Sequence, residues 1–206
     1  MYVPQHFAGD PAAIEEVVAT HDFALLVTTG PGGPEATHLP LLLDRSRGEH
    51  GVLLGHLARA NPHAEAIDGR EALAIFSGPH AYVSPRWYAA APAVPTWNYV
   101  AVHVHGRARV LRDKERLAEL VDRLSRRYEG DTPWTVAGLP ERFLAGMVDG
   151  IVGLEIDVAR IEAKFKLSQN RSPADRRNVI AELERGGAPG DVALAAAMRR
   201  FAPPPG

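Results

Sequence analysis

The sequence of 206 residues contains no cysteine. This absence excludes disulfides and thiolate metal sites, and it leaves the redox compartment of the protein undecided. No apolar run approaches the ~20 residues that a membrane-spanning helix needs. Residues 1–10 have neither the basic nor the apolar segment of a secretion signal. We therefore expect a cytoplasmic protein with no membrane partner.

A strong charge of either sign is also lacking. The chain has 23 Lys and Arg against 25 Asp and Glu, a formal net charge of −2. No global field therefore points to nucleic acid or excludes it. The hydrophobic content of 46% is enough for one core, or for one core with a small helical appendage. We expect a single domain over residues 1–206.

Short segments of apolar or alternating character predict strands. The expected strands are residues 23–29, 35–44, 51–57, 72–77, 80–84 and 98–111, and residues 151–168 form one more strand or a bent pair. The GPGGP turn at 30–34 joins the first two into a hairpin. Pro40 favours an edge or a bulge in the second strand. Gly78 and Pro79 separate the fourth strand from the fifth.

The segment 98–111 shows the clearest strand pattern. Its even positions from Val100 to Val110 are small and apolar. Its odd positions from Tyr99 to Arg109 carry Tyr, His and Arg, with Ala101 as the exception. Successive side chains of a strand point to opposite faces, so one face is predicted to be core and the other polar.

Proline after a capping residue marks several helix starts, at Asp10, Asn61 and Ser172. Helices are expected from these starts and over residues 113–129, 140–148 and 191–200. Strands in hairpin order with helices gathered near the C-terminus favour an antiparallel barrel or sandwich with peripheral helices.

One candidate site lies in the segment GHLARANPH, residues 55–63. A helix that begins after Asn61 presents unpaired N–H groups that hold anions such as phosphate. Arg59, His56 and His63 would add charge nearby. The alternative is an ordinary capped helix with surface cations.

Histidines on strands form further candidates. His38 lies within the second expected strand, where a core or edge role is the alternative to a functional one. His103 and His105 lie on the same face of one strand, a spacing that suits metal binding. Imidazoles that face a polar cavity explain the pattern as well, and we predict no metal.

Two later segments carry ligand-binding side-chain types. The loop 84–99 bears Trp87, Tyr88 and Trp97, which either wall a flat ligand or plug the end of a barrel. The segment KFKLSQNR, residues 164–171, offers many donors and no negative charge. Such donors suit a phosphate or a flavin ring edge, and the alternative is a solvated strand edge guarded by lysines.

Taken together, these motifs resemble one family over nearly the whole chain, the FMN-binding negative transcriptional regulators of the PaiB type. The resemblance rests on MYVPQHF, THLPLLLD, GHLARANPH, YVSPRWY, VPTWNYVAVHVHG and KFKLSQNR in this order. It implies a mainly β, antiparallel FMN-binding split β-barrel with peripheral helices. The barrel would lie mostly within residues 1–168, followed by a helical tail at 172–206, in a homodimer with FMN at the interface.

The resemblance also implies the flavin contacts. The expected cofactor-binding residues are Thr37, His38, Leu39, His56, Arg59, Asn61, His63, Trp97, Asn98, Lys166, Ser168 and Gln169. Arg59, Asn61 and His63 would hold the phosphate. Proline and histidine stand here where relatives of the wider superfamily often have arginine and lysine, which leaves more of the binding to the helix N-terminus.

Two functions follow from the resemblance. The first is a regulator that couples flavin binding or redox state to repression of transcription. DNA is a further partner to consider, since Arg171, Arg176 and Arg177 could face phosphates from one helix. The alternative is an FMN-dependent oxidoreductase, with His38 as the first proton donor to test. The sequence identifies no catalytic residue and no substrate.

Overall fold

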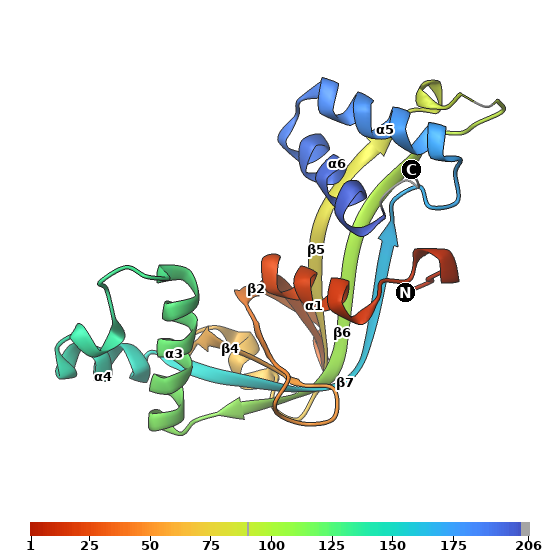
Figure 1. Cartoon of the computed structure of the whole chain (residues 1–206). Helices are drawn as coiled ribbons and strands as arrows, with labels where there is room; N and C mark the ends of the chain where they lie inside the picture. Colours follow the sequence, from red (N-terminus) through yellow and green to blue (C-terminus); the bar gives the residue numbers. More distant parts are fainter. Residues whose placement is uncertain (90, 203–206) are drawn as a thin grey trace. The chain divides into compact units, whose positions relative to one another are not determined.

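The computed structural model describes residues 1–89 and 91–202, which contain six α-helices, three short 3-10 helices and seven strands (Figure 1). The helices are η1 (Gln5–Phe7), α1 (Pro11–Thr20), α2 (Pro62–Ala66), η2 (Pro85–Trp87), α3 (Lys114–Glu129), η3 (Val136–Gly138), α4 (Glu141–Asp149), α5 (Pro173–Gly186) and α6 (Pro189–Phe201). The strands are β1 (Phe23–Gly30), β2 (Gly33–Pro40), β3 (Leu42–Asp44), β4 (Val52–Ala58), β5 (Glu71–Val83), β6 (Thr96–Leu111) and β7 (Ile151–Lys166).

The strands form one antiparallel sheet in the order β2-β1-β5-β6-β7-β4-β3. The order has two ends, so the sheet does not close into a complete barrel. β1 and β2 form the predicted hairpin, in which Phe23 pairs with Pro40 and Gly30 with Gly33. Because β2 is an edge strand, Pro40 needs no ladder partner for the N–H that it lacks. The predicted fold, an open antiparallel split barrel with peripheral helices, is confirmed.

The described residues divide into two compact units. Unit 1 contains Met1–His21, Phe76–His103 and Glu162–Gly206, and unit 2 contains Asp22–Ile75 and Val104–Ile161. Both units have fully buried apolar residues, such as Phe76 in unit 1 and Leu26 in unit 2. The expectation of a single domain over residues 1–206 stays a prediction, and residues 203–206 of the expected tail lie outside the described residues.

The core of unit 2 joins helix α3 to the sheet. Leu120 and Leu124 of α3 pack in one buried cluster with Val52 and Leu54 of β4. Leu117 packs in a second cluster with residues that include Val148 of α4. Each leucine buried in this way contributes about 1.5–3 kcal/mol. These three leucines follow helical spacing along α3, whereas Tyr128 near the end of the helix remains 54% exposed.

The core of unit 1 includes the helix pair α5 and α6, which lie side by side in Figure 1. Val179, Ile180 and Leu183 of α5 and Leu194 of α6 are fully buried. Ser172 caps α5 through a bond from Asp175 N at 3.1 Å, as the Ser-Pro sequence predicts. Among the described helices, none combines the length and the apolar composition that crossing a membrane requires.

Two strand boundaries differ from the expectation, and for residues 151–168 the first of the two expected alternatives, a single strand, is found. Residues 72–77 and 80–84 form one continuous strand, β5. Gly78 allows this because a Cβ there would lie 2.9 Å from the Cβ of Val100 on β6, so the glycine permits close strand approach. The expected strand 35–44 is divided into β2 and β3 after Pro40, and residues 151–166 form a single strand, β7.

Candidate functional site

A buried polar cluster in unit 2 gathers three of the predicted flavin contacts around His63. Nε2 of His63 lies 2.8 Å from Oγ1 of Thr28, and Nδ1 lies 2.9 Å from Oγ1 of Thr37. The amide of Asn61 donates to Oγ1 of Thr37 at 3.3 Å, and Oδ1 of Asn61 accepts from the backbone of His63 at 3.0 Å. We call Thr28, Thr37, Asn61 and His63 the His63 cluster.

The His63 cluster forms because the β1–β2 hairpin and the capped start of α2 place their polar side chains next to each other. Thr28 and Thr37 belong to the same face of the hairpin, since Thr37 pairs with Leu26 and Thr28 pairs with Glu35. Asn61 begins α2 and turns the next residues toward that face. His63 is only 3% exposed and both ring nitrogens are bonded. Its imidazole is therefore held within the fold, and its predicted phosphate contact stays a prediction.

Burial lowers the pKa of His63 below its ordinary value of 6.5, and the carboxylate of Glu35 opposes this shift. Oε2 of Glu35 is buried and has no hydrogen-bond partner in the described part of the chain. Burial also lowers the pKa of His56, whose Nδ1 is likewise without a partner there. Both imidazoles are therefore neutral at neutral pH.

Acidification is expected to destabilise the protein through His63. Its pKa is lower in the folded state, so the unfolded chain binds the proton first as the pH falls. The contribution is fully present above about pH 6.5 and is lost as the pH falls from there through the folded pKa. The variant His63→Gln should be less stable at neutral pH by about 1–3 kcal/mol and should lose less stability on acidification.

Urea unfolding at about pH 7.5 and about pH 5 measures this difference. The matched control is His50→Gln, an exposed histidine, which should keep the pH dependence of the unchanged protein. Equal loss of stability on acidification in the unchanged protein and in His63→Gln would contradict the prediction.

Arg59 and His38, two further predicted flavin contacts, also belong to unit 2. The Arg59 guanidinium donates from Nε to the carbonyl of Asp149 at 2.6 Å and from Nη2 to the carbonyl of Ile151 at 2.9 Å. Within the described residues, these two bonds leave Nη1 without a hydrogen-bond partner. The exposed ring of His38 stacks on Phe23 with centroids 6.0 Å apart, whereas Leu39 is buried. The side chains of His38 and Leu39 therefore point to opposite faces of β2.

In unit 1, the polar segment after β7 forms hydrogen bonds to β6 and to its own backbone. Nδ2 of Asn98 donates to Oγ of Ser168 at 2.8 Å, and Ser168 has a left-handed backbone with φ 65°. Gln169 accepts from Leu167 N at 2.8 Å and donates to the carbonyl of Phe165 at 2.5 Å. Asn98 and Ser168 are buried, although Oδ1 of Asn98 has no partner in the described residues. Their predicted flavin contacts stay predictions.

One face of the sheet in unit 1 exposes aromatic side chains. Trp97 of β6 is 54% exposed, and its ring lies 6.2 Å from that of Tyr82 on β5. Tyr99 shares this face with Trp97, and the ammonium of Lys164 lies 5.6 Å from the centre of the Tyr99 ring. Lys166 follows on the same face of β7 and donates to Oγ1 of Thr96. We call Tyr82, Trp97, Tyr99, Lys164 and Lys166 the aromatic face.

Positive charge collects beside these aromatic rings. The pKa of Lys166 lies below its ordinary value because of burial, with repulsion from Lys164 and Arg171 as further causes. An anion bound here would relieve this repulsion. The aromatic face therefore offers a flat apolar surface next to cations, the chemistry that a flavin with its phosphate requires.

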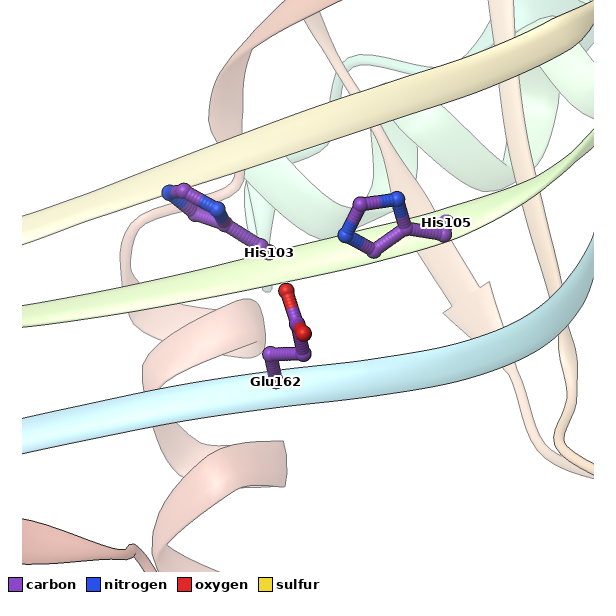
Figure 2. Close-up of side chains that lie close together, drawn as sticks. All are labelled: His103, His105 and Glu162. Carbon is purple, nitrogen blue, oxygen red and sulfur yellow. The ribbon is translucent and has the colours of Figure 1, made fainter. Parts of the chain in front are cut away.

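His103 and Glu162 lie on the neighbouring strands β6 and β7 of unit 1 (Figure 2). Their ligand atoms come within 4.8 Å of each other. Oε2 of Glu162, however, accepts from the α-amino group of Met1 at 2.6 Å. A structural zinc site needs four ligands, and this pair, with one carboxylate oxygen already in an ion pair, supports no metal assignment.

The arginines expected to face DNA do not act as a set. Arg176 is 7% exposed, and its guanidinium donates to the carbonyl of Ala202 at the end of α6. Arg171 lies 4.5 Å from the centre of the Tyr88 ring. The expectation that Arg176 reaches phosphates is wrong, because its position on α5 turns it toward α6 and the interior.

Sequence reasoning missed Thr28 and Glu35 of the His63 cluster region. Thr28 is 2% exposed and continues the buried face of Ala24 and Leu26 on β1. The sequence did contain a signal for this pair. Thr28 continues the apolar alternation of Ala24 and Leu26, and it lies opposite Glu35 in the expected hairpin. Only the structure shows that Thr28 bonds to the imidazole of His63 and that Glu35 opposes the lowering of the His63 pKa.

Solved structures of the same fold include flavoproteins. The chain is similar to the FAD and heme binding protein from Mycobacterium smegmatis, at 16% identity and TM-score 0.59, over 79% of this chain and 74% of that one. It is also similar to the flavocytochrome Anf3 from Azotobacter vinelandii, at 14% identity and TM-score 0.57, over 80% and 72%. At these identities the likeness shows the fold, and it defines the class as the split barrels.

Comparison of sequences identifies the family. Residues 1–160 match the family model described as "Putative FMN-binding domain". The chain is 41% identical over 188 residues to the Protease synthase and sporulation protein PAI 2 of Bacillus subtilis (strain 168), over 89% of each chain. An uncharacterized protein of Emericella nidulans, AN0679, is 29% identical over 94% of each chain. The chain belongs to this FMN-binding family of the PaiB type.

FMN is therefore the cofactor of this family member. Within each unit, described residues fit such a group. The aromatic face of unit 1 supplies rings and cations. Unit 2 supplies Asn61, the remaining Nη1 of Arg59 and the unpartnered Nδ1 of His56. These are donors and acceptors of the kind that a phosphate and a flavin ring edge bind.

Proposed function

We propose that this chain acts as a homodimer that holds FMN at the subunit interface and couples flavin binding or redox state to repression of transcription. Family membership supports the flavin. The regulatory part is supported by membership of the PaiB type and by the 41% identical relative, which is named a protease synthase and sporulation protein. The exposed aromatic face of unit 1 is the observation that carries the dimer.

The aromatic face suits association with a second copy. Trp97 and Tyr82 are 54% and 43% exposed on a regular sheet surface, and aromatic residues are enriched at protein interfaces. A flat isoalloxazine ring could lie between this surface and the second copy. We propose Trp97 and Asn98 as contacts to the flavin ring or the ribityl chain. Lys166, Ser168 and Gln169 are proposed to close the site from the second subunit.

The remaining flavin contacts are proposed in unit 2. Thr37, His38 and Leu39 would run beside the ring through the exposed edge of β2, and His56 would offer its unpartnered Nδ1. Arg59 and Asn61 would bind the phosphate, with His63 holding Asn61 and Thr37 in place. When bound, FMN supplies reversible redox chemistry, and the residues named here bind and orient it.

The purified protein is expected to retain flavin absorbance after it is mixed with FMN and desalted, and to elute as a dimer. The variant Lys166→Ala should bind FMN about tenfold to a hundredfold more weakly, because it removes a charged donor from a cluster of cations. Titration of flavin fluorescence measures the dissociation constant, and light scattering measures the mass.

Lys114→Ala is the matched control, since Lys114 is an exposed lysine of α3 whose partner is Asp149. It should leave FMN affinity unchanged. A monomer with flavin bound would overturn the interface site, and an unchanged affinity in Lys166→Ala would remove Lys166 from it. Reduction of bound flavin by a nicotinamide cofactor, followed by turnover, would favour the oxidoreductase instead of the regulator.

A further inference from the structure

A polar groove in unit 1 is lined by residues that are not among those proposed for flavin. It has a volume of about 420 Å³, within the range of small-molecule sites. The described residues that line it are Arg86 and Trp87 of η2 and Asn178, Ala181, Glu182 and Arg185 of α5. We call it the Arg86 groove. The four residues of α5 follow helical spacing and form one face of that helix.

Both walls of the Arg86 groove are held by specific contacts. Ser84, which is 3% exposed, caps η2 and accepts from Nε of Arg86 at 3.2 Å. The backbone N–H of Ala89 donates to Oδ1 of the buried Asp175 on α5 at 2.7 Å. These bonds tie η2 to the beginning of α5. The groove is therefore a feature of folded elements and does not depend on a free loop.

The charges in the groove favour an anion. Arg86 and Arg185 are cationic and Glu182 is anionic, so the lining has one excess positive charge. Glu182 forms an ion pair with Arg185, and this bond is the main cause that lowers the pKa of Glu182, with a smaller effect from Arg86. Because Glu182 mainly neutralises Arg185, the terminal amino groups of Arg86 carry the free charge.

The shape of the groove favours a planar ring. Trp87 is half-buried and contributes its indole to one wall. Ala181 occupies the centre of the α5 face, where its methyl group leaves space that a longer side chain would fill. Asn178 adds an amide that both donates and accepts. An indole wall beside a guanidinium and an amide matches a ring that bears a carboxylate.

We propose that the Arg86 groove binds a small organic anion with a planar ring, an aromatic or heteroaromatic carboxylate. The carboxylate accepts from the terminal amino groups of Arg86, and the ring packs on Trp87 above Ala181. Asn178 bonds to ring substituents. The lining residues of this site are distinct from the proposed flavin contacts.

Fluorine NMR of protein labelled with 5-fluorotryptophan tests the proposal. The chain has three tryptophans, so Trp87→Phe assigns the Trp87 resonance. The protein is saturated with FMN, so that the probe does not report on the flavin site. Benzoate is expected to shift the Trp87 resonance saturably, and the uncharged benzamide should bind at least about tenfold more weakly.

Two variants separate charge from shape. Arg86→Gln should weaken benzoate binding at least about tenfold, because it removes the charged donor. Ala181→Leu should abolish binding by filling the groove, while leucine remains a good helix former at an exposed position. The controls are Arg142→Gln on α4 and Ala193→Leu on α6, both exposed, which should bind like the unchanged protein.

Three results would overturn the proposal. The first is a Trp87 resonance that shows no saturable shift at millimolar benzoate. The second is unchanged benzoate binding in Ala181→Leu with its melting temperature preserved. The third is equal affinity for benzamide and benzoate, which would remove the anion from the proposed ligand class.

Discussion

The variant Gly106→Ala is expected to lose about 3 kcal/mol or more of unfolding free energy. An alanine Cβ at this position of β6 would lie 2.1 Å from the carbonyl oxygen of Asp157 on β7. The nearest atom is backbone, so no side-chain rotation relieves the clash. The two strands would have to separate, and neighbouring contacts such as the ion pair between Arg109 and Asp157 would be disturbed.

Chemical denaturation measures this loss, together with the yield of soluble protein. The control is Gly32→Ala in the β1–β2 turn, because a Cβ there meets nothing within 4 Å and no positive φ is required. That variant should stay within about 0.5 kcal/mol of the unchanged protein. If Gly106→Ala were as stable as Gly32→Ala, the close approach of β6 and β7 at this point would be wrong.

The variant Trp97→Glu is expected to convert the proposed dimer to a monomer and to abolish FMN retention. Trp97 lies beside Tyr82 on the aromatic face and is 54% exposed in the single chain. A tryptophan at the centre of an interface commonly carries about 2–4 kcal/mol, a thirtyfold to thousandfold change in affinity. A buried carboxylate would add a desolvation cost.

Light scattering after gel filtration and the absorbance of retained flavin measure the two effects. Trp134→Glu makes the same change at another tryptophan, which is 44% exposed and lies outside the aromatic face. It should remain dimeric and keep FMN. A dimeric, flavin-loaded Trp97→Glu would show that the aromatic face is not the interface, and a monomeric Trp134→Glu would place the interface elsewhere.

Local signals in the sequence predicted most elements. Asp10, Asn61 and Ser172 each cap the helix that was expected to follow, through bonds to backbone N–H groups within three residues. The expected strand 98–111 lies within β6, and its even positions are buried from Asn98 to Ala108, as the alternation indicates. Capping and alternation depend on near neighbours in the chain, so they can be read without the fold.

Signals that depend on distant residues were misread or missed. The continuity of β5 through Gly78 depends on Val100, which lies on the next strand. Arg176 belongs to a basic stretch, yet α6 buries it. The bonds from His63 to Thr28 and Thr37 were not predicted. In each case the partner is more than twenty residues away, so no local pattern reveals it.

By itself, the sequence determined the antiparallel sheet with peripheral helices, the capped helix starts and, through its ordered motifs, the FMN-binding family. Only the tertiary structure decided that His63 is a neutral, internally bonded residue, that Ser168 accepts a bond from Asn98 of β6, and that Arg86 and Trp87 face one side of α5. Secondary structure follows from neighbours along the chain. Burial, pKa and the shape of a site follow from which distant elements pack together, because packing removes water and supplies the partners.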